Sequence, residues 1–183
     1  FRLLLVEGSL GGGYEIGLET AVSLAQRLQG EHHLSVELVV AGRVTPAVEA
    51  VWQERAGVPL TFVGLVSAER IPWLDRSAHL LYAADINAAC PNSVIEALAC
   101  GLPVLAFDTG ALPELVTGDA GRVVPYGGDP WRLDPPDIPA LAQAAVEVFQ
   151  QQERFRAGAR QRAEAALGLE PMVEHYLDML VRS

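Results

Sequence analysis

The sequence predicts an α/β fold with an open, doubly wound parallel sheet of about six strands, followed by C-terminal helices. Two observations carry this prediction. Short apolar runs without polar alternation recur from residue 2 to about residue 125, which is typical of strands buried on both faces of a parallel sheet. Helical patterns with Gly or Pro at their ends separate these runs, as in repeated βαβ units. The predicted fold is therefore Rossmann-like.

Six apolar runs are the predicted strands. They are LLLV (3–6), ELVVAG (37–42), LTFVGLV (60–66), HLLYAAD (79–85), PVLAFD (103–108) and RVVP (122–125). Between the first two runs, helical spacing places four apolar side chains on one stripe: Ile16, Val22, Ala25 and Leu28. The 183 residues, half of them hydrophobic, suffice for one domain, which we expect to span residues 1–183.

The strand pattern ends at the Pro-rich connection WRLDPPD, residues 131–137, and only helices are predicted after it. Their expected ranges are 138–151, about 153–167 and 171–181. The middle helix is rich in Arg and Gln, which indicates a solvated face. The last has apolar residues spaced for packing, namely Met172, Val173, Tyr176, Leu177 and Leu180.

Charge and composition exclude several classes of function. The formal net charge of -10 disfavours a nucleic-acid partner, because binding a phosphate backbone needs a basic face. All 13 basic residues are Arg, which excludes mechanisms that need a lysine, such as a Schiff base or a P-loop. Cys90 and Cys100 have no CxxC or nearby His, so we interpret them as reduced core residues and expect no metal.

The termini and the hydropathy pattern bear on location. No apolar run reaches membrane-spanning length, and the opening FRLLLVEGS lacks the features of a signal peptide. The chain begins without Met and directly in a strand, so we interpret it as a fragment. We expect a cytoplasmic protein.

In open parallel sheets the ligand lies at the carboxyl ends of the strands, where three loops are informative. The first loop is EGSLGGGYEIG, residues 7–17, whose glycines allow close approach of the backbone to a phosphate. It contains no G-x-G-x-x-G, and the second strand ends without a ribose-binding acid, which disfavours NAD. Arg43 at the end of the second strand would still allow binding of a ribose that carries a 2′-phosphate. For the first loop, the alternative interpretation is a Gly-rich turn that binds no ligand.

The second loop is GLVSAERIP, residues 64–72. Ser67 is a favoured N-cap residue and predicts the beginning of a short helix. A plain strand-to-helix turn is one interpretation. In a nucleotide-binding sheet, the exposed backbone at Leu65 and Val66 would instead contact the edge of a base.

The third loop precedes the helix of residues 93–99. Ser93 to Glu96 is a literal S-x-x-E, which is typical of a capping box. Pro91 and Asn92 also expose a helix beginning directly after a strand, where the N–H groups of Ser93 and Val94 form an anion site. Glu96, one turn further on, would then accept hydrogen bonds from ribose hydroxyls. Both interpretations remain open at this point.

The segment CPNSVIEALACGLPVLAFDTGALPELV, residues 90–116, resembles the donor-site segment of the group 1 retaining glycosyltransferases. These enzymes have the GT-B architecture of two facing Rossmann-like domains. The resemblance rests on the Asn-Ser before the helix, on Glu-Ala-Leu-Ala-Cys-Gly-Leu-Pro-Val, on the Asp-x-Gly-Ala-x-Pro-Glu turn and on the later VVPYGGD. It extends over nearly the whole chain but covers only the C-terminal, donor-binding domain. The acceptor-binding N-terminal domain is absent, and the last helix would pack back against it.

The resemblance implies a role for each matching residue. Glu96 would bind the ribose hydroxyls, and Leu65 and Val66 the edge of the base. The residues implied to lie near the diphosphate are Gly8, Ser9, Asn92, Ser93 and Val94. The substrate would be a nucleotide sugar, with no cofactor and no obligatory metal ion.

Two departures from the family pattern concern the reacting sugar phosphate. Ala88 stands where the family has a Glu or Asp that contacts the donor sugar, which leaves the catalytic residue unknown. The first loop also lacks the Arg and Lys that the family presents to the diphosphate. Because the leaving-group charge must be stabilised, an Arg must reach in from elsewhere, Arg43 and Arg70 being the candidates, or turnover is weak or lost.

Three functions follow as hypotheses. The first is the donor domain of a retaining hexosyltransferase that binds its acceptor through the absent domain, which would also provide any contact with a membrane surface. This fragment alone would bind the nucleotide without catalysis. The second is a degenerate GT-B domain that serves as a binding or scaffolding module. A nucleotide-sugar epimerase is disfavoured, since no His lies at a strand carboxyl end.

Overall fold

The computed structural model describes residues 1–10 and 15–182 and confirms the predicted fold class. Six strands form one parallel sheet in the order β3-β2-β1-β4-β5-β6. The strands are β1 (Arg2–Ser9), β2 (Glu37–Arg43), β3 (Leu60–Gly64), β4 (Leu80–Ala83), β5 (Val104–Phe107) and β6 (Gly121–Val124). Each coincides with one of the predicted apolar runs.

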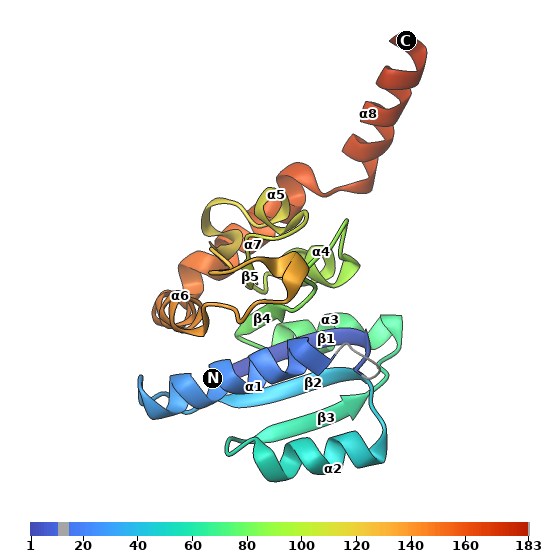
Figure 1. Ribbon diagram of the computed structural model, residues 1–183. Helices are drawn as coiled ribbons and strands as arrows, with labels where there is room; N and C mark the ends of the chain where they lie inside the picture. The colour runs from blue at the N-terminus through green and yellow to red at the C-terminus, as the bar shows by residue number, and fades with distance from the viewer. Residues whose placement is uncertain (11–14, 183) are drawn as a thin grey trace.

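Helices connect the strands and end the chain (Figure 1). The α-helices are α1 (Glu15–Gly30), α2 (Pro46–Arg55), α3 (Ile71–Ser77), α4 (Asn92–Ala99), α5 (Leu112–Leu115), α6 (Ile138–Gln150), α7 (Gln152–Ala166) and α8 (Leu169–Arg182). Short 3₁₀ helices are η1 (Ala68–Arg70), η2 (Gly118–Ala120) and η3 (Pro130–Arg132). The three predicted C-terminal helices are confirmed as α6, α7 and α8.

The sheet separates two hydrophobic cores. Leu3 and Leu5 of β1 face a core shared with α1 and α6, whereas Leu4, between them, faces the core built with α4. Successive side chains of a strand point to opposite faces, so an uninterrupted apolar run fills both cores. This is why the predicted strands showed no polar alternation.

The prediction that every strand is buried on both faces is wrong for β3. Its residues are half-buried or exposed, and Val63 is 42% exposed. β3 is an edge strand, paired only with β2, and the neighbouring helix α2 has no buried residue. The edge position therefore leaves its apolar side chains in contact with solvent.

The Arg-rich helix α7 has the predicted solvated face, on which Arg154 and Arg160 are exposed, but its other face packs into the fold. Phe155, Ala159 and Ala163 are buried along one face. Arg156 donates hydrogen bonds to the carbonyl oxygens of Ala78 and Gly101. On the same helix, Arg160 donates to the carbonyl oxygen of Ala99. Arg162 donates to the carbonyl oxygens of Glu114 and Leu115. These arginines satisfy carbonyl groups that helix ends and turns leave without partners.

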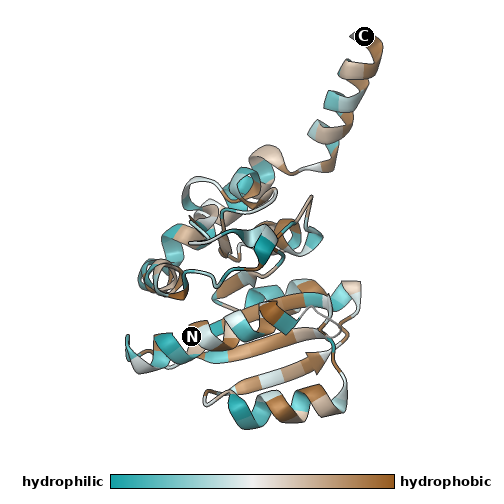
Figure 2. Cartoon of the chain, viewed as in Figure 1, coloured by the Kyte–Doolittle hydropathy of each residue, from teal (hydrophilic) through white to brown (hydrophobic). Residues whose placement is uncertain are grey.

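The final helix α8 extends away from the sheet at the C-terminus (Figure 1). Its predicted apolar stripe is exposed, with Met172 at 48% and Leu177 at 54%. Figure 2 shows apolar residues along this projecting helix. The exposure distinguishes α8 from α6, whose apolar stripe is buried. In the part of the chain that the structure describes, no helix is both long and apolar enough to cross a membrane.

Candidate functional site

A cleft lies where the strand order reverses between β1 and β4. It has a volume of about 410 Å³ and is formed by the carboxyl ends of β1 and β2, the loop after β3 and the beginning of α4. This reversal is the usual ligand position in an open α/β sheet. Five residues predicted from the sequence line it: Gly8, Leu65, Val66, Ser93 and Glu96.

The beginning of α4 shows no capping box between Ser93 and Glu96. Pro91, with extended backbone, occupies the N-cap position, and no side chain caps the helix. The predicted capping box is therefore not formed, and the Glu96 side chain is exposed in the cleft. The N–H of Val94 donates to the carbonyl oxygen of Pro91 at 3.1 Å, and the Val94 side chain is fully buried. Of the two N–H groups considered for an anion, only that of Ser93 belongs to a residue lining the cleft.

The first loop contributes its beginning to the cleft. Gly8 lines the cleft, and Ser9 is exposed opposite Arg43 in the β1–β2 register. Residues 11–14 of the predicted loop lie outside the described residues. The β2 backbone passes so close to this loop that a Cβ on Gly42 would lie 2.3 Å from the carbonyl oxygen of Glu7. The absence of a side chain at position 42 therefore allows β2 to pass this close to Glu7.

Arg43 and Arg70, the two candidates to replace the Arg and Lys that the first loop lacks, lie in different places in the structure. Arg43 is exposed and does not line the cleft. Arg70 lines an adjoining cavity of about 490 Å³, together with Trp73 and the two residues shared with the cleft, Leu65 and Val66. Arg70 therefore lies beside the position considered for the base. Asn92, exposed at the first position of α4, also does not line the cleft.

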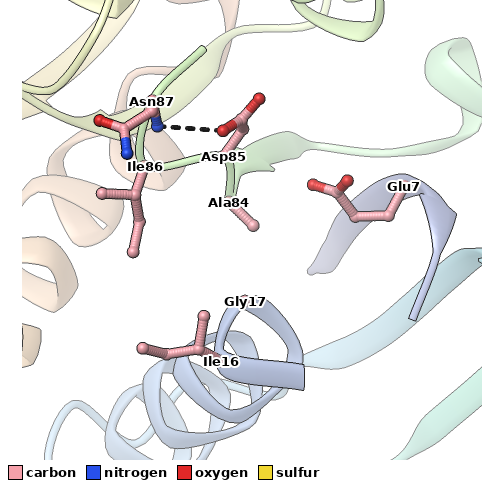
Figure 3. A pocket seen from close by; sticks show the side chains of 7 residues that line it. All are labelled: Glu7, Ile16, Gly17, Ala84, Asp85, Ile86 and Asn87. Carbon is pink, nitrogen blue, oxygen red and sulfur yellow. Dashed lines mark hydrogen bonds between the residues drawn. The ribbon is translucent and has the colours of Figure 1, made fainter. Parts of the chain in front are cut away.

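Two acidic residues that sequence reasoning missed, Glu7 and Asp85, line the same cleft. They also line a second cavity of about 340 Å³, bounded by the beginning of α1 (Figure 3). Burial, and secondarily the charge of Asp85, raises the pKa of Glu7 to about 7. Asp85 accepts a hydrogen bond from the backbone N–H of Asn87 at 3.0 Å. Asp85 ends a predicted strand and Glu7 directly follows one, and these positions were the signal that could have identified them.

Position 88, where the family pattern has an acid, is a packing position in this chain. Ala88 is 2% exposed, and its carbonyl oxygen accepts from the N–H of Ala111 at 2.7 Å. Gly110, with a φ of 55°, approaches Ala88 so closely that a Cβ on it would lie 2.4 Å from that oxygen. Position 88 is therefore buried, and its backbone lies against the loop that follows β5.

The cysteines only partly meet the prediction that they belong to the core. Both thiols are free, but Cys90 is exposed and Cys100 is half-buried at the end of α4. Cys90 lies in the turn before α4, where no element covers it, so the prediction is wrong for this residue. Within residues 1–10 and 15–182, no three His, Cys, Asp or Glu side chains are grouped to hold a metal ion.

Comparisons with known proteins agree on one family. The family model described as glycosyl transferases group 1 matches residues 2–151. A GDP-mannose-dependent α-(1-6)-phosphatidylinositol dimannoside mannosyltransferase of Mycobacterium tuberculosis is 29% identical over 133 residues, which are 72% of this chain and 32% of that protein. The O-antigen chain mannosyltransferase B of Escherichia coli is 28% identical over 130 residues, 68% of this chain and 31% of that protein. The chain thus spans about a third of the length of these relatives.

Solved structures share the fold over essentially the whole chain. Sucrose-phosphate synthase from Thermosynechococcus elongatus has a TM-score of 0.73 at 22% identity, covering 100% of this chain and 46% of that one. HepE of Anabaena, solved in complex with UDP-glucose, has a TM-score of 0.74 at 17% identity, and the match covers 100% of this chain and 49% of that one. At these identities the likeness concerns the fold alone.

Proposed function

Because the chain belongs to the group 1 glycosyltransferases, we propose that it is the donor-binding domain of a retaining enzyme that transfers a hexose from a nucleotide sugar to an acceptor hydroxyl. One observation carries the proposal. The carboxylate of Glu96 and the beginning of α4 lie in one cleft, at the switch point of the sheet, with Leu65 and Val66 on the wall next to them. A nucleotide needs a base contact, a ribose acceptor and a phosphate site in this order.

The three parts of the nucleotide have separate places in this proposal. The base lies against the backbone at Leu65 and Val66, where the cleft meets the cavity of Arg70. The ribose hydroxyls donate hydrogen bonds to Glu96. The diphosphate lies over Ser93 and Gly8, close to the positive end of the α4 dipole. No metal ion is required in this arrangement.

Guanine is the proposed base. Arg70 is exposed beside Leu65 and Val66, and its two parallel N–H donors fit the O6 and N7 acceptors of guanine. Uracil offers no such adjacent pair of acceptors. The M. tuberculosis relative is named as GDP-mannose-dependent, which supports the same base.

The complete enzyme, in this proposal, has an N-terminal acceptor-binding domain, and that domain covers the apolar stripe of α8. Two observations support it: the stripe is exposed, and the chain spans about a third of its curated relatives. The chain alone should bind the nucleotide without transferring sugar. Transfer with retention would use the departing phosphate as the base for the acceptor hydroxyl, with the leaving-group charge stabilised partly by the second domain.

A catalytically degenerate binding module is the second candidate function. It is favoured by Ala88, which supplies no acid toward the donor sugar. Among the described residues lining the cleft there is also no arginine. If the chain joined to its N-terminal domain transferred sugar, the enzyme hypothesis would be supported and the binding module contradicted. Nucleotide binding without any turnover of that complete protein would decide for the module.

Calorimetric titration of the 183-residue chain with GDP, UDP and ADP tests donor binding. We expect GDP to bind most tightly and Glu96→Ala to weaken it at least tenfold, because one charge-assisted pair of hydrogen bonds is lost. Glu54→Ala, an exposed acid on α2 outside the cleft, is the matched control and should leave the affinity unchanged. Equal binding by the wild type and Glu96→Ala would contradict the proposed site.

A further inference from the structure

We propose that Glu7 binds the diphosphate of the donor as a neutral carboxylic acid, donating a hydrogen bond to a phosphate oxygen, so that donor binding takes up a proton. The proposal rests on the proposed function and adds a residue and a linkage that the family resemblance does not supply. It assigns to Glu7 the place of a missing cation, since a carboxylic acid donates a hydrogen bond whereas a carboxylate only accepts.

Glu7 is held at the centre of the site. It lies near the end of β1 and lines both the cleft containing Glu96 and the adjoining cavity at the beginning of α1. The close passage of Gly42 fixes its backbone from the side of β2. Figure 3 shows its carboxyl group turned into the space between β1 and the loop that carries Asp85. A group bound over Gly8 and Ser93 would therefore meet this carboxyl group.

Among the described residues that line the two cavities with Glu7, the only charged side chains are acidic. Asp85 comes from the loop after β4, and Glu96 comes from α4. On β4, the Tyr82 phenol has a pKa raised mainly by burial and to a lesser extent by Glu7, so it is neutral. The other described residues lining the two cavities carry no charge, those contributed by α1, β2 and the loop after β3 included. A diphosphate entering with all three acids ionised would meet strong repulsion in a partly buried cleft.

Protonation of Glu7 removes one of these charges and is accessible near neutral pH. Burial and Asp85 raise its pKa to about 7 in the free protein. A bound diphosphate adds further negative charge nearby and raises this pKa again. Protons and donor therefore promote each other's binding, so affinity should fall as pH rises through about 7. Because the protonated fraction falls about tenfold between about pH 6 and about pH 8, the association constant should fall by about the same factor.

The test is calorimetric titration of the whole chain with GDP-mannose and with UDP-glucose. A nucleotide sugar is the suitable probe because its diphosphate keeps the same charge over this pH range, unlike that of a free nucleoside diphosphate. Titrations at about pH 6 and about pH 8, each in two buffers of different ionisation enthalpy, give both the affinity and the number of protons bound. We expect the affinity to fall about tenfold and close to one proton to be taken up at about pH 8.

Three variants separate Glu7 from other titrating groups. Glu7→Gln keeps a hydrogen-bond donor without titration, so its affinity should not change with pH. Asp85→Asn removes one cause of the raised pKa, so the affinity should begin to fall at a lower pH. Glu54→Gln, which removes an exposed acid on α2 outside the cleft, should leave the pH dependence as in the wild type.

The outcomes distinguish this proposal from the proposed function. Nucleotide-sugar binding that is independent of pH, without proton uptake, would overturn the role of Glu7 and leave the donor site standing. An unchanged pH profile in Asp85→Asn would overturn it as well, even if Glu7→Gln failed to fold. Absence of binding by a folded chain at both pH values would overturn the donor site, and the role of Glu7 with it.

Discussion

Asp75 of α3 and Glu96 of α4 are coupled across the interface between their helices. Asp75 is 1% exposed, and burial, followed by the charge of Glu96, raises its pKa to about 7, while the Cys100 thiol hydrogen-bonds to it. One carboxyl oxygen of Asp75 has no hydrogen-bond partner. The helix that presents the ribose ligand is thus packed against a buried acid.

Replacing Asp75 should make stability depend less on pH. The pKa is higher in the folded protein than in the unfolded chain, where it is about 4, so the folded state binds the proton more tightly. The corresponding stability is fully present below about pH 4 and is lost as pH rises to about 7. Asp75→Asn should therefore be more stable than the wild type by about 4 kcal/mol at about pH 8, with the difference disappearing near pH 4. Urea unfolding at several pH values measures this, and a constant difference would contradict it.

Gly42 should be required for both the fold and the cleft. A Cβ at this position would lie 2.3 Å from the carbonyl oxygen of Glu7, at a φ of 149°. Gly42→Ala should lower the free energy of unfolding by about 2–4 kcal/mol, because backbone rather than a flexible side chain must move. Gly30→Ala, where no atom lies within 4 Å of the added Cβ, is the control and should be near neutral in urea unfolding. Equal stability of the two variants would contradict the close approach.

Arg156 should contribute to stability although it belongs to a charged helix. Its guanidinium group donates to the carbonyl oxygens of Ala78 and Gly101, and these contacts are partly buried. Arg156→Ala leaves both oxygens without this partner and should cost about 1–3 kcal/mol. Arg132→Ala, an exposed arginine in η3, should cost less than about 0.5 kcal/mol. Thermal unfolding of the two variants compares them, and equal costs would indicate a solvated α7.

The apolar stripe of α8 should contribute to stability only in the presence of the second domain. Leu177 is 54% exposed, so Leu177→Asp should change the stability of this chain by less than about 0.5 kcal/mol. In the complete protein the same substitution should weaken the contact between the domains and lower the unfolding temperature. Glu174→Arg, elsewhere on the helix, is the control. An equal loss of stability in the short chain would show that the stripe packs within it.

The elements of the fold were predictable because their signals are local. An uninterrupted apolar run such as LLLV reports a strand whose two faces are both buried, and the sheet confirms it for β1. The exposure of Val63 was not predictable in this way, since it depends on β3 lying at the edge of the sheet. Likewise, the carbonyl partners of Arg156 are 55 and 78 residues away, so the charge pattern of α7 could not predict these contacts.

In the candidate site, too, some features were predictable from local sequence and others depended on residues distant in the sequence. The rule that ligands lie at strand carboxyl ends was sufficient to bring together Gly8, Leu65 and Glu96. The S-x-x-E motif failed as a capping box because Pro91, two residues earlier than Ser93, occupies the N-cap position. The raised pKa of Glu7 needed the structure, since it arises from burial and from Asp85, which is distant in sequence.

The central claim, that Glu96 binds the ribose of the donor, is tested most directly by a double-mutant cycle. The affinities of GDP and its 2′-deoxy and 3′-deoxy forms are measured by calorimetry for the wild type and Glu96→Ala. If Glu96 accepts hydrogen bonds from the ribose hydroxyls, removing a hydroxyl should weaken binding to the wild type about tenfold and have little further effect in the variant. If the hydroxyl and the carboxylate contribute independently, Glu96 does not contact the ribose, and the assignment of this cleft as the donor site is contradicted.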